Sequence, residues 1–121
     1  MFAKKNRASK KDIDEIFKDG SFINSANLTF KFLIKKENSF KKVSFIVPKS
    51  VSKKAIIRNK LRRLGYLVLE KHTDLLPNGT LAVFVFKNSA GFLDKTKKEA
   101  FLNLEKEILF ILSKIKTQET L

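Results

Sequence analysis

The stretch Thr-Leu-Ala-Val-Phe-Val-Phe at residues 80–86 decides the fold, because it is apolar almost throughout. A short apolar run of this kind predicts a central β-strand that is covered on both faces. Pro-Asn-Gly at residues 77–79 is a turn signal before it, and Ser-Ala-Gly at residues 89–91 breaks the chain after it. The rest of the chain must supply the elements that cover this strand.

Three segments with helical periodicity can provide that cover. The first spans residues 12–18, where Ile13, Ile16 and Phe17 share one face. Ser9 is its expected N-cap, and Gly20 is expected to end it. A long helix is predicted over residues 53–71 and a final one over residues 96–115. Their apolar stripes are Ile57, Leu61, Leu64 and Val68, and Phe101, Leu104, Ile108, Leu112 and Ile115.

Alternating side chains predict further strands before the long helix. Residues 28–35 alternate between Leu, Phe, Phe and Ile on one face and Thr, Lys and Leu on the other, and residues 42–47 form the next strand. The polar turn at residues 35–39 predicts that these two strands form a β-hairpin. Residues 21–24 are a possible short strand.

The order of elements is therefore helix, two or three strands, helix, strand and helix, all in one domain of 121 residues with a basic arm at residues 1–11. This order predicts an α+β two-layer sandwich with one small mixed sheet. The long helix is a candidate crossover between two parallel strands. The two longer helices are expected on one face of the sheet and the short first helix elsewhere.

Composition excludes several classes of protein. The chain has no Cys and one His, so it offers no thiol nucleophile, no thiolate zinc site and no His cluster. No apolar stretch approaches the roughly 20 residues that span a bilayer, and no apolar segment follows the basic N-terminus as in a signal peptide. We expect a cytoplasmic protein with no membrane partner, no catalytic residue of its own and no metal site.

The charge distribution points to a polyanionic partner. The net charge is +14, and residues 1–71 hold 19 Lys and Arg against 6 Asp and Glu, whereas residues 72–121 hold 7 against 6. Such a local field attracts nucleic acid. An anionic membrane could attract the same charge, and a general lysine bias could serve solubility alone. Such a bias would not leave the last fifty residues nearly neutral, so nucleic acid is the favoured partner.

The basic residues concentrate in the window 49–63, which holds seven of them and no acid. Three of the four Arg residues of the chain lie here, and an Arg side chain can clamp phosphate oxygens with two donors where Lys cannot. On a helix, Arg58 aligns with Arg62 and Asn59 with Arg63, opposite the apolar stripe. The predicted RNA-binding residues are Lys49, Lys53, Lys54, Arg58, Asn59, Lys60, Arg62 and Arg63.

Residues 47–63, Val-Pro-Lys-Ser-Val-Ser-Lys-Lys-Ala-Ile-Ile-Arg-Asn-Lys-Leu-Arg-Arg, resemble the signature of the bacterial ribonuclease P protein component. That signature is a strand ending in Ser/Pro-Lys-Lys, a loop, and a helix with Arg-Asn-Arg. The resemblance extends to Lys5-Asn6-Arg7 and to Phe-Lys-x-Gly at residues 17–20. It departs where Lys60 replaces the second Arg, where Ser-Lys at residues 52–53 replaces a Gly in a longer loop, and where Gly65 lies inside the helix.

The resemblance implies the protein subunit of the ribonucleoprotein that removes the 5′ leader from precursor tRNA. In that family the RNA subunit is the catalyst and uses Mg²⁺, while the protein binds no cofactor of its own. The implied partners are ribonuclease P RNA and precursor tRNA, with no obligate protein partner. The family fold also implies a left-handed βαβ crossover. The residues Lys54, Arg58, Asn59, Lys60, Arg62 and Arg63, called the basic row below, would bind the RNA subunit. Lys4, Lys5 and Arg7 of the arm extend the basic surface.

The resemblance further implies a cleft between the first helix and the sheet that binds the single-stranded leader. Ile13 and Phe17 would form its helix wall. Its sheet wall would come from one face of residues 28–33, for which an ungapped match favours Thr29 and Lys31, while Phe30 and Phe32 occupy the other face. The alternative for all three Phe residues is ordinary core.

Other functions remain open at this point. A ribosome-associated RNA-binding protein with no role in cleavage shares the size, the charge and sometimes the fold. A DNA-binding module is disfavoured because no tight helix-turn-helix spacing or dimerisation heptad is present. His72 with Asp74 is interpreted as a polar helix end, Tyr66 as a residue at the core boundary, and Lys95, Lys97 and Lys98 as a solvated first turn.

Overall fold

The predicted central strand lies in the middle of a four-stranded sheet. A computed structural model of the chain describes residues 6–89 and 92–119, and of residues 116–119 the backbone alone. β4 (Thr80–Phe86) lies between β2 (Leu28–Ile34) and β3 (Lys41–Ile46), and β1 (Ser21–Asn24) forms the edge beyond β2. Every residue of β4 except Val85 is buried, which confirms that the strand is covered on both faces.

The predicted hairpin between the second and third strands is wrong. β2 and β3 do not pair with each other, because β4 lies between them, antiparallel to β2 and parallel to β3. A strand that is apolar on both faces is most stable with a neighbour on each side, and this long-range pairing overrides the local turn at residues 35–39. The antiparallel pair that does form along the chain is β1 with β2, where Ile23 lies opposite Phe30.

The predicted crossover is confirmed. β3 and β4 are parallel neighbours, and α2 (Ala55–Glu70) connects them, so the chain contains one βαβ unit in an otherwise antiparallel sheet. A mixed sheet with three helices is the α+β architecture that the sequence predicted. Between α2 and β4 the chain also makes one short 3₁₀ turn, Thr73–Leu75.

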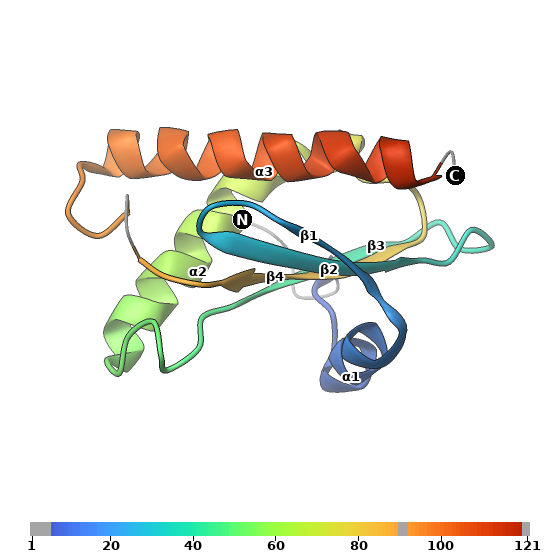
Figure 1. Ribbon diagram of the computed structural model, residues 1–121, viewed down its shortest axis with the longest axis horizontal. Helices are drawn as coiled ribbons and strands as arrows, with labels where there is room; N and C mark the ends of the chain where they lie inside the picture. Colours follow the sequence, from blue (N-terminus) through green and yellow to red (C-terminus); the bar gives the residue numbers. More distant parts are fainter. Residues whose placement is uncertain (1–5, 90–91, 120–121) are drawn as a thin grey trace.

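The two faces of the sheet carry two separate cores. α2 and α3 (Lys97–Glu119) lie on one face, and α1 (Lys10–Asp19) lies on the other (Figure 1). Phe84 of β4 belongs to the large core beneath α2 and α3, and Val83 belongs to a small core beneath α1 with Ile16. Alternate residues of one strand therefore pack against different helices.

Gly65 explains how closely α2 approaches the sheet. A Cβ atom at this position would lie 2.5 Å from Cδ2 of Phe45 on β3. The Phe45 ring stacks on Phe84 with centroids 4.9 Å apart, and the Phe45 N–H donates to the Tyr66 hydroxyl at 3.1 Å. Glycine inside a helix costs about 1 kcal/mol relative to alanine, and here its missing side chain lets the helix pack directly on an aromatic ring. Tyr66 was expected at the boundary of the core, and it is buried as part of the large core.

The helix ends follow the predicted caps with modest shifts in length. Ser9 Oγ accepts from the Asp12 N–H at 3.2 Å, and Asp12 Oδ2 accepts from the Ser9 N–H at 2.9 Å, which is a complete capping box. α1 is longer than predicted by a few residues. Thr96 Oγ1 accepts from the Glu99 N–H at 3.1 Å at the start of α3. Within the described residues no helix is long and apolar enough to cross a membrane.

Candidate nucleic-acid interface

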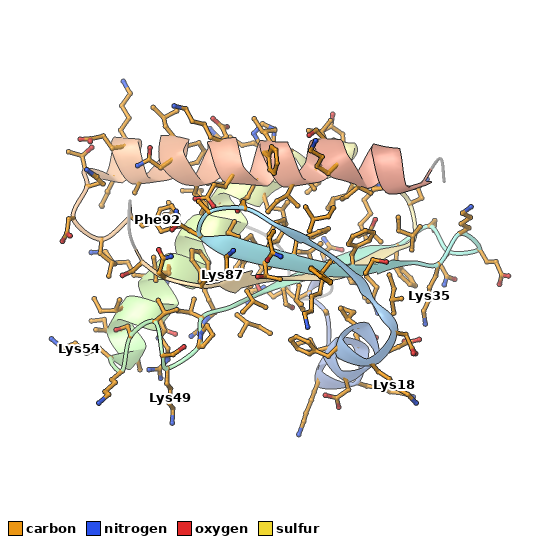
Figure 2. The ribbon with its side chains drawn as sticks, viewed as in Figure 1. Lys18, Lys35, Lys49, Lys54, Lys87 and Phe92 are labelled. Carbon is orange, nitrogen blue, oxygen red and sulfur yellow. The ribbon has the colours of Figure 1, made fainter. Side chains whose placement is uncertain are left out.

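The basic window lies at the N-terminal end of α2 and in the loop before it. β3 ends at Ile46, the loop at residues 47–54 follows, and α2 begins at Ala55. The first turn of α2 contains no acidic residue, and Lys54 at the N-cap makes no side-chain capping bond. Lys49 and Lys54 project away from the body of the protein at this end (Figure 2). The positive end of the helix dipole adds to their charge.

Arg58 has a structural role that its predicted place in the row did not reveal. Its Nη1 donates to the carbonyl oxygens of Ser52 at 3.0 Å and of Lys53 at 2.9 Å. The side chain is half-buried, so its guanidinium closes the loop against the helix. Arg58 therefore holds the loop that carries Lys53 and Lys54 in a fixed arrangement. Because Nη1 is used in these two bonds, only the other N–H donors of its guanidinium group remain for an anion.

Asn59 orients the next arginine of the row. Its Oδ1 accepts a hydrogen bond from Nη2 of Arg62. Asn59 is exposed and Arg62 is half-buried. Lys60 and Arg63 are exposed, whereas Leu61 between them is buried.

No carboxylate neutralises this surface within the part of the chain that the structure describes. The ion pair between Lys35, just after β2, and Glu15 of α1, at 2.9 Å, lies away from the row. Lys49, Lys53, Lys54, Lys60 and Arg63 have no such partner among the described residues. Like charges placed this closely repel one another, and an external polyanion would remove that cost.

The N-terminal arm is represented by Arg7, because Lys4 and Lys5 lie outside the described residues. The guanidinium carbon of Arg7 lies 4.2 Å from the centroid of the Tyr66 ring on α2. The Ala8 carbonyl accepts from the Ser44 hydroxyl at 3.1 Å, which ties the arm to β3. The arm therefore brings a further cation to the α2 side of the sheet.

On the opposite face, α1 and β2 bring together the residues predicted for the cleft. Ile13 is half-buried against the small core, whereas the Phe17 side chain is 46% exposed. Nζ of Lys31 lies 4.6 Å from the centroid of the Phe17 ring. Thr29, on the same face of β2, donates from Oγ1 to Asn24 Oδ1 at 2.7 Å.

The alternation of β2 decides which side chains face α1. Phe30 and Phe32 are buried in the large core under α3, at 0% and 5% exposure, so the core alternative holds for both. Thr29 and Lys31 point to the other face. Phe17 does not follow the core alternative, since about half of its side chain remains open to solvent.

Phe22 is a residue of this surface that the sequence analysis missed. It is the most exposed Phe of the described residues, at 61%, and lies directly opposite Lys31 in the antiparallel register of β1 with β2. Two exposed rings, Phe17 and Phe22, thus flank one lysine. Four residues of β1 were too few to show a face from sequence, and only the pairing with β2 assigns one.

His72 pairs with an acidic residue other than the one that the sequence suggested. His72 Nε2 lies 2.8 Å from Glu105 Oε2, which ties the end of α2 to α3, whereas the sequence paired it with Asp74. Across residues 6–89 and 92–119, no three His, Asp or Glu side chains gather to hold a metal ion.

Comparisons with known proteins bear on the family and on the fold. The model of the family described as Ribonuclease P matches residues 2–115. The structure resembles the RNase P protein of Staphylococcus aureus with a TM-score of 0.71 at 18% identity, covering 89% of this chain and 92% of that one. It resembles the RNase P protein of Thermotoga maritima with a TM-score of 0.71 at 21% identity, covering 89% and 96%. No curated protein matches the chain by sequence.

Proposed function

The chain belongs to the ribonuclease P protein family, and we propose that it binds the RNA subunit of that enzyme and the 5′ leader of precursor tRNA. Membership of the family places it in an endoribonuclease holoenzyme that processes tRNA. The observation that carries the proposal is the uncompensated row of cations along the start of α2. Such a row suits a phosphate backbone, whose contacts dominate nucleic-acid affinity.

The RNA subunit is assigned to the α2 surface. Lys49, Lys53 and Lys54 supply point charges from the loop, and Lys60 and Arg63 supply them from the exposed side of the helix. Arg58 and Asn59 support the surface, because one holds the loop and the other holds Arg62. Lys60 in place of a second arginine keeps the charge and loses a two-donor contact.

The leader is assigned to the α1 face of the sheet. Unpaired nucleotides are held by basic grooves that also offer aromatic rings for stacking. Phe17, Lys31 and Phe22 provide this combination within one surface, with Thr29 and Ile13 beside them. α2 packs on the other face of the sheet from α1, but its N-terminal end extends below the sheet in the view of Figure 1. The RNA subunit at this end of α2 and the leader at α1 would therefore approach the same side of the protein.

Catalysis is assigned to the RNA subunit with Mg²⁺, and the protein positions RNA and screens its charge. The chain has no Cys and a single His, so it offers few side chains of the kinds that act as a nucleophile or a general base. Assembly of such a particle takes place in the cytoplasm, and the proposal requires no membrane and no further protein.

The binding of ribonuclease P RNA to paired lysine variants tests the proposal. Lys54→Gln/Lys60→Gln removes two exposed cations from the α2 surface, and Lys36→Gln/Lys106→Gln removes two exposed cations elsewhere. Each lost phosphate contact should reduce the slope of log affinity against log salt by about 0.7–0.9. We expect a weaker affinity and a shallower slope for the first variant alone.

Two outcomes would contradict the proposal. Equal behaviour of the two variants would make the α2 row an ordinary solvated surface. Stronger binding of the parent protein to a ribosomal RNA fragment than to ribonuclease P RNA would instead favour a ribosome-associated protein.

A further inference from the structure

A groove lies beside the basic row, between the middle of α2 and the start of α3. Its volume is about 380 Å³, within the roughly 300–1,000 Å³ of small-molecule sites. Leu64 and Leu67 of α2 form one wall, and Leu93 and Phe101 form the other. Phe92, between α2 and α3 in Figure 2, is buried and closes the floor.

The walls of this groove expose apolar surface that nothing in the described chain covers. The Leu67 side chain is 51% exposed and that of Leu93 is 38% exposed. Leaving such side chains in water forgoes the stabilisation that burial would bring. Both leucines face one hollow, so a single occupant would cover them together.

The rim of the groove is cationic. Lys60 and Arg63 stand on the α2 side, and Lys95 and Lys97 stand on the other. All four are exposed, and none has a carboxylate partner among the described residues. An occupant that matches this groove therefore combines an apolar body with negative charge at its edges.

We propose that the groove holds one unpaired nucleotide of the RNA that binds α2, with its base against the leucines and its phosphates on the rim. The inference rests on the proposed function, because Lys60 and Arg63 belong both to the RNA-binding row and to this rim. An RNA backbone that follows the row passes the mouth of the groove. A splayed-out nucleotide has the required features, because its base has flat apolar faces and its flanking phosphates are negatively charged.

The test compares a groove variant with a matched variant outside the groove. Leu67→Gln/Leu93→Gln makes the two exposed walls polar, whereas Leu102→Gln/Leu75→Gln changes leucines of similar exposure, at 44% and 38%, that do not line the groove. The probe is transcribed ribonuclease P RNA. Its affinity is measured over a range of salt, and its unpaired bases are mapped by chemical modification.

We expect the parent protein to protect at least one unpaired base, and we expect the groove variant to lose that protection. Its affinity should fall about five- to tenfold, the effect of losing roughly one side chain of apolar contact. The salt slope should stay unchanged, since the phosphate contacts remain. The matched variant should behave as the parent does.

A second variant addresses the rim. Lys95→Gln/Lys97→Gln should expose the same base to modification and should also reduce the salt slope, because it removes phosphate contacts. These lysines lie outside the window at residues 49–63, so their effect separates the groove from the α2 row. If Lys95→Gln/Lys97→Gln leaves the footprint intact, the groove does not hold a nucleotide.

The remaining outcomes also decide whether the groove holds a nucleotide. An unchanged footprint and affinity for Leu67→Gln/Leu93→Gln overturns the inference while leaving the proposed function standing. A change in sedimentation of the protein alone, with RNA binding unaffected, would assign the groove to a protein partner and overturn it too. Failure of the parent to bind the RNA at all would remove the proposed function, and the inference with it.

Discussion

Nζ of Lys31 lies 4.6 Å from the centroid of the Phe17 ring, so a charge from β2 and a ring from α1 are in contact. A cation above an aromatic face is a favourable contact of about 0.5–1 kcal/mol at exposed sites. The contact holds the half-exposed ring of Phe17 in place while leaving part of it open to a base.

Replacing Phe17 with Leu should weaken the binding of leader-bearing precursor tRNA to the reconstituted holoenzyme. The substitution keeps most of the apolar volume and removes the stacking surface, which is worth about 1–3 kcal/mol per base. Mature tRNA, which has no leader, should bind as before. Phe110→Leu is the matched control, because Phe110 is 48% exposed and lies on α3, on the other face of the sheet.

Phe22→Leu should reduce leader-dependent binding in the same way, because Phe22 lies opposite Lys31 on β1. Equal losses for precursor and mature tRNA, in either variant, would show that the ring supports the fold and not the leader. No loss in either variant would leave the α1 face without a substrate role.

The two surfaces differ in how far the sequence alone could predict them. The α2 row was predictable because its residues lie in one window of a single helix, where spacing translates directly into position. The surface beside α1 combines residues of α1, β1 and β2, and strand pairing decides which side chains of β1 and β2 belong to it. Only the resemblance suggested Thr29 and Lys31, and nothing suggested Phe22.

The wrong prediction of a hairpin between the second and third strands has the same cause, because local sequence does not show which strands pair. The turn at residues 35–39 is a local signal, whereas the insertion of β4 between β2 and β3 depends on contacts between residues about 40 to 60 apart. The apolar pattern of β4 predicted its central position correctly. It carried no information about which strands would be its neighbours.

Gly65→Ala should destabilise the protein even though alanine is the better helix former. The added Cβ would lie 2.5 Å from a Phe45 ring atom, and that ring is held between Phe84 and Tyr66. Overpacking of this kind costs about 1–3 kcal/mol. Denaturant unfolding should show the loss, and Leu67→Ala on the exposed side of the same helix should change stability much less.

A double-mutant cycle identifies the cause of that loss. Phe45→Leu/Gly65→Ala should be more stable than the sum of the single effects predicts, because the smaller side chain makes room for the methyl group. Additive effects would mean that the cost of alanine arises from somewhere other than contact with Phe45.

The capping box of α1 should make stability depend on pH. Partial burial alone would raise the pKa of Asp12, but hydrogen bonds from Ser9 and the charges of Lys42 and Lys35 lower the pKa below its ordinary value of 3.8. Because the folded pKa is the lower one, the stabilisation is complete above pH 3.8 and disappears as the pH falls through the folded value.

Asp12→Asn provides the comparison for that pH dependence. The parent should exceed the variant in the free energy of unfolding by up to about 1 kcal/mol near pH 6, and the difference should shrink progressively as the pH falls below 3.8. A difference that persists unchanged at low pH would show that the ionised carboxylate does not contribute to the cap.

The central claim is that this protein assists an RNA catalyst, and cleavage of precursor tRNA at low Mg²⁺ tests it most directly. The ribonuclease P RNA of the same organism is held at a Mg²⁺ concentration too low for it to act efficiently alone, and the protein is then added. We predict that the protein restores cleavage at the 5′ end of the mature tRNA, and that the protein without the RNA releases no leader. Failure of the protein to stimulate cleavage, or leader release by the protein with all contaminating RNA removed, would contradict the account.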